Sequence, residues 1–368
     1  MRFNLPISAH LVRTLALSLG FAACVLWGIE RTAEVMLVQL TGDPSTPSSQ
    51  GVGHPHLLWE MPPGDVDVQD QRIEVNSMGA RGPELEKNPS SGIRRVISVG
   101  GDTAFGRGVK RSETYSVDAI NILGGNRVGV ETILLAVPEY TIDQTRNLMD
   151  MRGWSLVPNL LIIAGPAHEM DVAPYVDKDV ISRFKSPIEV SHSLKESAVF
   201  RVLDYWLRIH TGPTAQRRQN AFIQGQNINP QGRPRVGTNT YAQHLNRLVE
   251  DTLKNQADIV FVMLPVPADL MASHIDDRVL LYREALNHVA VRHGVPIVDG
   301  PKLFADSGRK QAELFAENAT LTKRGHRILS YALAQKLRPW LRGRKLNKKG
   351  TGATIPTLKE PSLIGDAI

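Results

Sequence analysis

The sequence is poor in cysteine, in aromatic residues and in net charge, and each shortage excludes a class of protein. Cys24 is the only cysteine in 368 residues, so the chain forms no internal disulfide and has no metal site of the CxxC type. Aromatic residues make up 6% of the chain and are not interleaved with basic ones, so we expect no nucleic-acid partner. The net charge is only +6, so the chain is not strongly basic as a whole. We also expect no cofactor.

An apolar stretch near the N-terminus carries the targeting information. Residues 14–29 contain no charged side chain, and two arginines precede them. We predict a cytoplasmic N-terminus over 1–13 and an uncleaved signal anchor, a single transmembrane helix, over 14–35. The remaining chain then lies on the extracytoplasmic side of the membrane. A cleaved signal peptide or lipoprotein and a buried helix of a soluble protein stay open as alternatives.

Composition divides the rest of the chain into a spacer, a folded domain and a tail. Residues 41–56 are rich in proline, glycine and serine, which predicts a spacer over 36–69. Residues 336–349 contain many lysines and arginines and no acid, which predicts a basic disordered tail over 341–368. The folded domain is therefore expected over 70–340.

Within this domain, apolar segments typical of strands alternate with segments of helical periodicity. The predicted strands are residues 94–100, 130–136, 160–165, 258–267 and 295–300. The predicted helices between and after them include 112–123, 141–151, 240–255, 278–293 and 323–337. This alternation predicts an α/β fold, a three-layer α/β/α sandwich around a mainly parallel five-stranded sheet of the flavodoxin-like type. Ligand sites in such folds lie beyond the carboxyl ends of the strands.

One segment, residues 172–257, is too long for a simple crossover and is predicted to be an insertion of helices and loops. Residues 195–210 place their apolar side chains on one face of a packing helix. Residues 211–240 are polar, and we expect either a surface loop or a lid that contacts a polymer. The charges available to such a lid come from four arginines, Arg217, Arg218, Arg233 and Arg235.

Five short motifs resemble blocks of the SGNH/GDSL hydrolase family, in its membrane-anchored bacterial form. The first is GGDTAFGRGV, residues 100–109, and NSMGARGPE at 76–84 precedes it as in those members. The others, in chain order, are AVPEYTIDQ at 136–144, NLLIIAGPAHE at 159–169 and FAENATLTKRGHRILSYAL at 315–333. The motifs are collinear with the predicted strands and together span the predicted domain.

The resemblance assigns a role to each motif position. The position of the nucleophilic serine holds Thr103, after Asp102, and the position of the glycine whose N–H stabilises the oxyanion holds Glu139. His168 stands where the family has its oxyanion asparagine, and Glu169 follows it. In the last block the family has an orienting acid and a histidine base.

Those two last-block positions hold Glu317 and Thr320 here, and threonine cannot accept a proton near neutral pH. His326 follows in the same motif, and we interpret it with Gly325 as a helix and packing residue. A metal site made by His168, Glu169 and Glu139 would use suitable ligand types but lacks diagnostic spacing, so we expect no metal.

Two functions follow from these substitutions. In the first, the chain is a degenerate, non-catalytic module that binds an acylated glycan or small ester, or scaffolds an assembly of the cell envelope. In the second, it is an active ester hydrolase or acyltransferase in which His168 replaces the missing base of Thr103. Glu169 or Glu317 would then orient the imidazole ring of this rewired triad.

Overall fold

The computed structural model describes most of the predicted domain and the N-terminal helix. Its described residues are 9–41, 52–54, 56–68, 71–86, 88–181, 197, 199–200, 202–203, 227–270 and 275–347. Most of the predicted helix at 195–210, together with Arg217 and Arg218, lies outside them, as do residues 348–368 of the tail.

A five-stranded parallel sheet forms the centre of the domain, as predicted. Its strands are β5 (Arg94–Val99), β6 (Val130–Leu134), β7 (Leu160–Gly165), β8 (Asp258–Met263) and β9 (Ile297–Asp299). They pair in the order β6-β5-β7-β8-β9, all parallel. Side chains of β7 and β8 are buried throughout, which explains why these strands are continuous apolar runs in the sequence.

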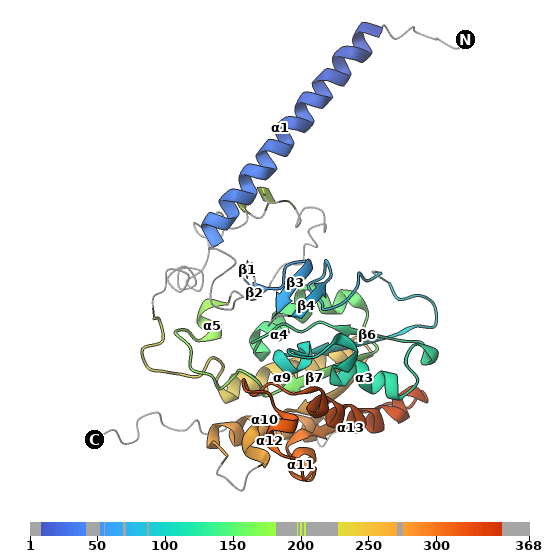
Figure 1. Cartoon of the computed structure of the whole chain (residues 1–368), viewed down its shortest axis with the longest axis vertical. Coiled ribbons are helices and arrows are strands. Elements are labelled where there is room, and N and C mark those ends of the chain that lie inside the picture. The colour runs from blue at the N-terminus through green and yellow to red at the C-terminus, as the bar shows by residue number, and fades with distance from the viewer. Residues whose placement is uncertain are drawn as a thin grey trace.

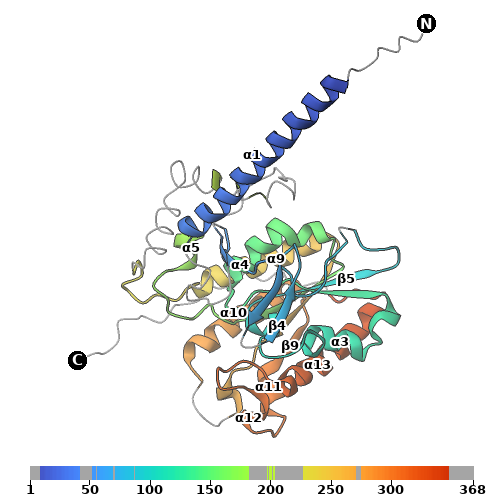
Figure 2. The same cartoon turned by 45° about the horizontal axis from the view of Figure 1, so that its top comes forward.

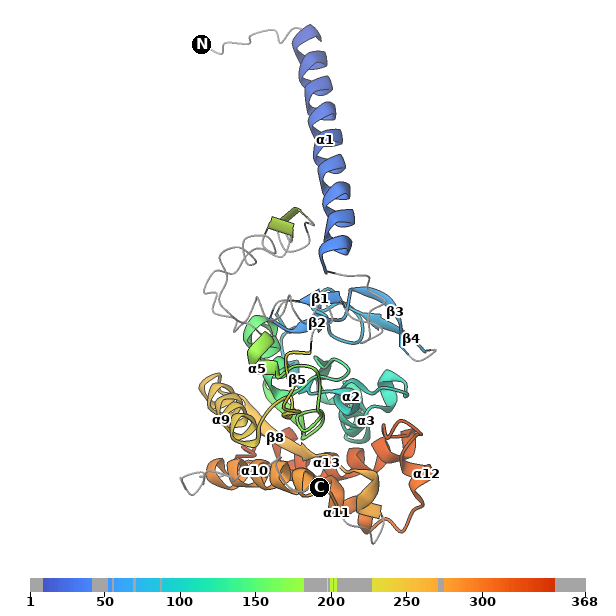
Figure 3. The same cartoon turned by 90° about the vertical axis from the view of Figure 1, so that its left-hand side faces the viewer.

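Helices cover both faces of this sheet. The longer ones are α3 (Tyr115–Ile122), α4 (Ile142–Leu148), α9 (Thr238–Lys254), α10 (Asp277–His293) and α13 (Lys323–Leu341). Helix α13 packs on α3, while α9 packs on α4 and α10. Helices α9 and α10 lie to one side of the strands and α3 to the other (Figure 3). The predicted three-layer architecture is therefore confirmed.

Shorter helical segments connect these elements. They are α2 (Asp102–Phe105), α5 (Asp177–Val180), α11 (Gly300–Ala305), α12 (Gln311–Leu314) and the turns η1 (Arg111–Glu113), η2 (Gly125–Val128), η3 (Met149–Gly153), η4 (Trp154–Leu156) and η5 (Pro267–Leu270). After α13, the start of the predicted tail returns to the sheet: Leu346 N donates to Asp258 Oδ1 over 3.0 Å, at the first residue of β8. The basic tail is thus held against the domain as far as residue 347.

The described residues between 52 and 68, in the second half of the predicted spacer over 36–69, are part of the folded domain, which corrects the sequence interpretation. They contain β1 (Val52–His54), β2 (Leu58–Glu60) and β3 (Gly64–Val68), the last paired with β4 (Gln71–Val75). These strands lie between the N-terminal helix and the parallel sheet (Figure 1). The apolar residues of the segment LLWEM at 57–61 are buried, and the Leu57 carbonyl oxygen accepts a hydrogen bond from the Gln144 side chain of α4. The many turn-forming residues in this region led us to predict a spacer and to overlook the buried segment at 57–61.

The N-terminal helix α1 (Ala9–Thr41) projects away from the domain (Figure 1, Figure 2). It is longer than the predicted anchor and continues through the charged pair Glu30 and Arg31. Phe21, Leu26 and Trp27 are each at least 66% exposed. Among the described parts of the chain, no helix has the length and apolar character needed to cross a membrane.

Candidate functional site

The motif GGDTAFGRGV connects β5 to the short helix α2 and brings three loops together. A Cβ atom on Gly101 would lie 2.9 Å from the carbonyl oxygen of Tyr140 and 3.2 Å from Cδ2 of His168. Only glycine permits this approach of the loops that follow β6 and β7. The motif therefore places Thr103 at the carboxyl edge of the sheet, where the fold class predicts a site.

Arg81, from the motif NSMGARGPE, holds the turn that follows Thr103. Its guanidinium donates hydrogen bonds to the carbonyl oxygens of Phe105, Gly106 and Val109, at 2.9, 2.7 and 2.7 Å. It also lies over the Phe105 ring. Burial, and then the charge of Arg111, lowers the pKa of Arg81 to about 10. This motif therefore supports the site, a role that its sequence did not reveal.

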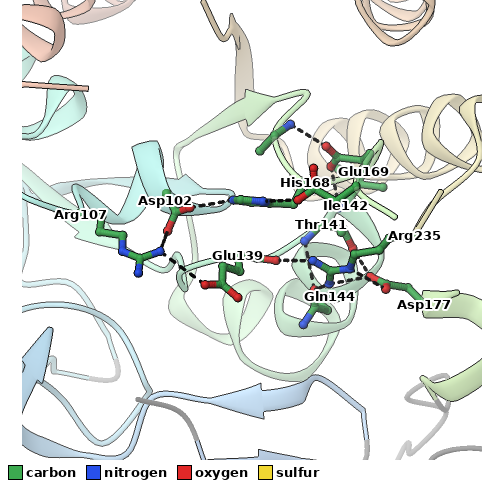
Figure 4. A network of polar contacts seen from close by, with 12 residues as sticks. Asp102, Arg107, Glu139, Thr141, Ile142, Gln144, His168, Glu169, Asp177 and Arg235 are labelled. Atoms are coloured by element: carbon green, nitrogen blue, oxygen red, sulfur yellow. Dashed lines mark hydrogen bonds and ion pairs between the residues drawn. The ribbon is translucent and has the colours of Figure 1, made fainter. Parts of the chain in front are cut away.

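His168 lies between two carboxylates (Figure 4). Its Nε2 is 2.7 Å from Oδ2 of Asp102, and its Nδ1 is 2.7 Å from Oδ2 of Asp171. Burial alone would lower the pKa of His168, but the two carboxylates outweigh it and raise the pKa to about 10. Burial would likewise raise the pKa of Asp102, yet His168 and Arg107 lower it. The ring is therefore an imidazolium at neutral pH, and both N–H groups are occupied.

The Thr103 hydroxyl takes part in no hydrogen bond within the described residues, so no base is bonded to it. The ring nitrogens of His168 are directed at Asp102 and Asp171 instead. The partners of His168 are Asp102 and Asp171, not the Glu169 or Glu317 considered for a rewired triad. Asp171 was missed in the sequence. Its only signal was its position three residues after His168, beyond the end of the motif.

Glu139 adopts a backbone conformation that favours glycine. Its φ is 63°, in the left-handed region that non-glycine residues rarely occupy. Its carboxylate is 39% exposed, and Oε1 lies 3.4 Å from Nη1 of Arg107. The same Nη1 lies 3.3 Å from Oδ1 of Asp102, so Arg107 connects the first and second motifs. A residue with a carboxylate side chain therefore stands where the backbone favours glycine.

Arg235 binds the other side of the Glu139 loop. Its Nη1 donates to the carbonyl oxygen of Glu139 over 2.8 Å, and its remaining nitrogens bind Asp177 and Gln144 (Figure 4). The guanidinium is buried, 5.5 Å from the ring centroids of both Trp59 and Tyr175. Arg235 is therefore a structural group, which corrects its assignment to a charged surface loop.

The reason for this burial is that the end of the insertion packs back onto the site. Arg235 N donates to the carbonyl oxygen of Asp171 over 2.9 Å, and Val236 N to that of Glu169 over 3.0 Å. Arg233, two residues earlier, stays half-exposed and pairs with Asp179 at 3.1 Å. Burial raises the pKa of Asp177, although the charge of Arg235 opposes the shift.

Glu169 is buried and binds backbone rather than the imidazole. Its carboxylate accepts hydrogen bonds from Ile142 N at 2.9 Å and Ala167 N at 2.6 Å. Burial raises its pKa, and these N–H groups partly offset the shift. Since Ile142 begins α4, Glu169 joins the end of β7 to the start of that helix.

The last motif forms a tight turn next to the loop of Thr103. Thr320 Oγ1 donates to Asn318 Oδ1 over 2.7 Å and lies 3.9 Å from where a Cβ on Gly108 would stand. Glu317 is exposed in the same turn. Thr320 therefore borders the site, but it offers a hydroxyl where a base would be needed.

His326 is a packing residue, as predicted. It is fully buried, accepts a hydrogen bond from Tyr115 N at Nδ1, and stacks on the Tyr115 ring. Burial, together with the charge of Arg81, lowers its pKa to about 3. Gly325 before it has no room for a side chain, because a Cβ there would lie 2.5 Å from the Leu314 carbonyl oxygen.

A metal ion would need several ligand side chains close together. Across the residues that the structure describes, no group of three or more histidine, cysteine, aspartate or glutamate side chains is arranged to hold a metal ion. The predicted ligand types His168, Glu169 and Glu139 point to different partners.

Comparison with known proteins identifies remote structural similarities. No protein-family model matches the sequence, and no curated protein matches it. An acetylxylan esterase from Geobacillus stearothermophilus is similar with a TM-score of 0.42 and 12% identity, over 69% of this chain and 96% of that one.

Two further solved structures are similar to the same degree. A putative lipolytic protein of the G-D-S-L family from Desulfitobacterium hafniense has a TM-score of 0.40 at 12% identity, over 66% of this chain and 98% of that one. An α/β hydrolase from the metagenome of Lake Arreo has a TM-score of 0.42 at 12% identity, over 68% and 95% of the two chains. Similarity at this level concerns the fold and says nothing about activity.

Proposed function

We propose that this chain is a non-catalytic module with an SGNH/GDSL-hydrolase-like fold, which binds a ligand in the former active-site cleft or scaffolds an assembly there. One observation carries the proposal: both ring nitrogens of His168 are hydrogen-bonded to carboxylates. A histidine held in this way keeps its proton at neutral pH and has no free nitrogen to accept one from Thr103.

The energetic consequence is large. Attack by a hydroxyl on an ester requires a base within hydrogen-bond reach, and removing that base from a serine-type triad costs on the order of a million-fold in turnover. The oxyanion that would form is also opposed, because Glu139 places a carboxylate where the resemblance implies only a backbone N–H. The two effects add to one another, because both oppose attack by the same hydroxyl.

The proposed ligand is an acylated glycan or a small ester. The proposed site has polar groups that suit hydroxyl-rich ligands, among them Thr103, Glu139 and Asp171. A module that has lost the base but kept the loops would retain this binding without turnover.

We also propose that the domain lies outside the cytoplasm and is attached to a membrane through α1. The exposed apolar side chains of α1, including Phe21 and Trp27, support the attachment. Sedimentation with membranes that resists alkaline carbonate, and is lost when residues 1–41 are deleted, is the expected result. A chain that remains in the supernatant would refute the attachment.

Hydrolysis of p-nitrophenyl acetate and butyrate tests the main proposal. The full chain, Thr103→Ala and His168→Ala should release p-nitrophenol at the same low rate, because neither side chain forms a working nucleophile and base. Labelling by a fluorophosphonate probe should be absent in all three. Turnover that disappears in either variant, or labelling of Thr103, would establish the hydrolase instead.

A further inference from the structure

Among the described residues, Arg107 is the cation that pairs with the Glu139 carboxylate, and a guanidinium is a group that can bind an anion. Its Nη1 is shared between Glu139 Oε1 at 3.4 Å and Asp102 Oδ1 at 3.3 Å, both longer than a strong ionic hydrogen bond. Its Nε is buried and has no partner among the described residues. The guanidinium therefore has donor capacity that these two carboxylates do not fill.

We propose that Glu139 is an internal occupant of this anion site and thereby a specificity-determining residue of the cleft. Its carboxylate stands against Arg107, so that the cleft accepts neutral or cationic ligands and rejects small anions such as phosphates and free carboxylates. The inference rests on the proposed ligand-binding function, since it states which ligands that cleft admits.

The backbone supports this role, because Glu139 is held at both ends. A non-glycine residue in the left-handed region is strained relative to its ordinary conformations. Arg235 offsets that strain by binding the Glu139 carbonyl oxygen over 2.8 Å, and Arg107 faces the carboxylate. Two arginines from different parts of the chain thus fix one side chain at the edge of the cleft (Figure 4).

The charges around Arg107 favour exclusion of anions. Three carboxylates, on Asp102, Glu139 and Asp171, face two cations, on Arg107 and His168. The two cations are largely buried, whereas the Glu139 and Asp171 side chains are 39% and 50% exposed. An incoming ligand therefore meets carboxylates first. Hydroxyl and ammonium groups can donate to them, and an anion is repelled.

Two substitutions at Glu139 remove the occupant in different ways. Glu139→Gly removes the whole side chain and relieves the left-handed strain, so this variant should fold at least as well as the parent. Glu139→Gln keeps the shape and removes only the charge. Glu250→Gln is the matched control, because it removes one exposed negative charge from the end of α9 that leads into the start of β8, at the opposite edge of the sheet.

The measurement is titration of each full-length protein with inorganic phosphate, at constant ionic strength, by calorimetry. Removing one like charge close to the bound anion is expected to raise affinity about fivefold or more in both Glu139 variants. Two unit charges a few ångströms apart repel by at least about 1 kcal/mol, which corresponds to that factor. Glu250→Gln should behave as the parent. Adding Arg107→Gln to Glu139→Gly should abolish the gain.

Three results would overturn the inference. Phosphate binding by the parent as tight as by Glu139→Gly would show that Glu139 excludes nothing. A gain that persists with Arg107→Gln would place the anion elsewhere, and phosphate binding by neither variant would show that Arg107 forms no anion site. None of these involves ester hydrolysis, so the proposed function fails or survives independently in the p-nitrophenyl assay.

Discussion

Replacing Arg235 by methionine should destabilise the domain by about 3–5 kcal/mol, the range for breaking a buried ion pair by removing one partner. The pair is well suited to this test, because the side chains of Arg235 and Asp177 are only 5% and 0% exposed. Methionine keeps an unbranched apolar chain between Trp59 and Tyr175, so that the change removes the charge and the hydrogen bonds more than the packing.

The magnitude can be obtained from the orphaned carboxylate. Without Arg235, Asp177 keeps only the hydroxyl of Thr141, at 2.6 Å, and it becomes neutral by taking up a proton. Protonation at pH 7 costs about 4 kcal/mol, since the ordinary pKa of aspartate lies about 3 units lower and each unit corresponds to about 1.4 kcal/mol. The carbonyl oxygen of Glu139 also loses its donor, which adds about 1 kcal/mol or more if water does not replace it.

Urea unfolding followed by tryptophan fluorescence measures this loss, with Arg233→Met as the matched control. Arg233 lies in the same segment and also pairs with an aspartate, but its side chain is 41% exposed, so its loss should cost less than about 1 kcal/mol. The direction in which the stability deficit of Arg235→Met changes with pH can also be predicted. A carboxyl whose folded pKa is raised binds more protons when folded, so the deficit of Arg235→Met should shrink as the pH falls from 7 to 5.

Two results would refute this reasoning. A loss below about 1 kcal/mol for Arg235→Met would mean that the pair is not needed to hold the insertion against the site. Equal losses for Arg233→Met and Arg235→Met would mean that burial does not separate the two arginines. Arg235→Met combined with Asp177→Asn should recover part of the stability, because it removes the buried charge as well.

The remaining predictions concern the turn after Thr103 and the charge of His168. Gly106→Ala should destabilise the domain by about 2–4 kcal/mol in the same assay, because Gly106 has a φ of 82° and a new Cβ would lie 2.1 Å from Thr114 Cγ2. Gly308→Ala is the control: its φ is 62° and the space around it is open, so it should lose only the backbone contribution of about 1–2 kcal/mol. Equal losses would contradict the packing explanation. His168 should titrate by NMR near its pKa of about 10, and Asp171→Asn should lower that pKa by about one unit or more. Because the pKa of His168 is raised in the folded state, its contribution to stability should be complete below about pH 6.5 and lost as the pH rises through about 10, and an unshifted titration near 6.5 would refute the bridging geometry.

The fold could be predicted because its signals are local. The strand predicted over 160–165 is β7 (Leu160–Gly165) in the structure. It could be recognised because a strand covered on both faces must be apolar at every position. The helix over 278–293 became α10, with Asp276 as its N-cap and a left-handed Gly294 at its end. The spacer was misjudged for the opposite reason. Leu57 is buried through contacts with segments far along the chain, and composition does not record those contacts.

The sequence by itself determined the α/β sheet, because strand periodicity is a property of neighbouring residues. It also predicted a site around Thr103, Glu139 and Thr320 at the carboxyl edge of that sheet. Only the tertiary structure decided which charged groups meet there. Asp102 and Asp171 meet on His168, and Arg235 reaches Glu139 from nearly a hundred residues away. Such charge pairs depend on distance in space and on burial, and sequence separation carries neither.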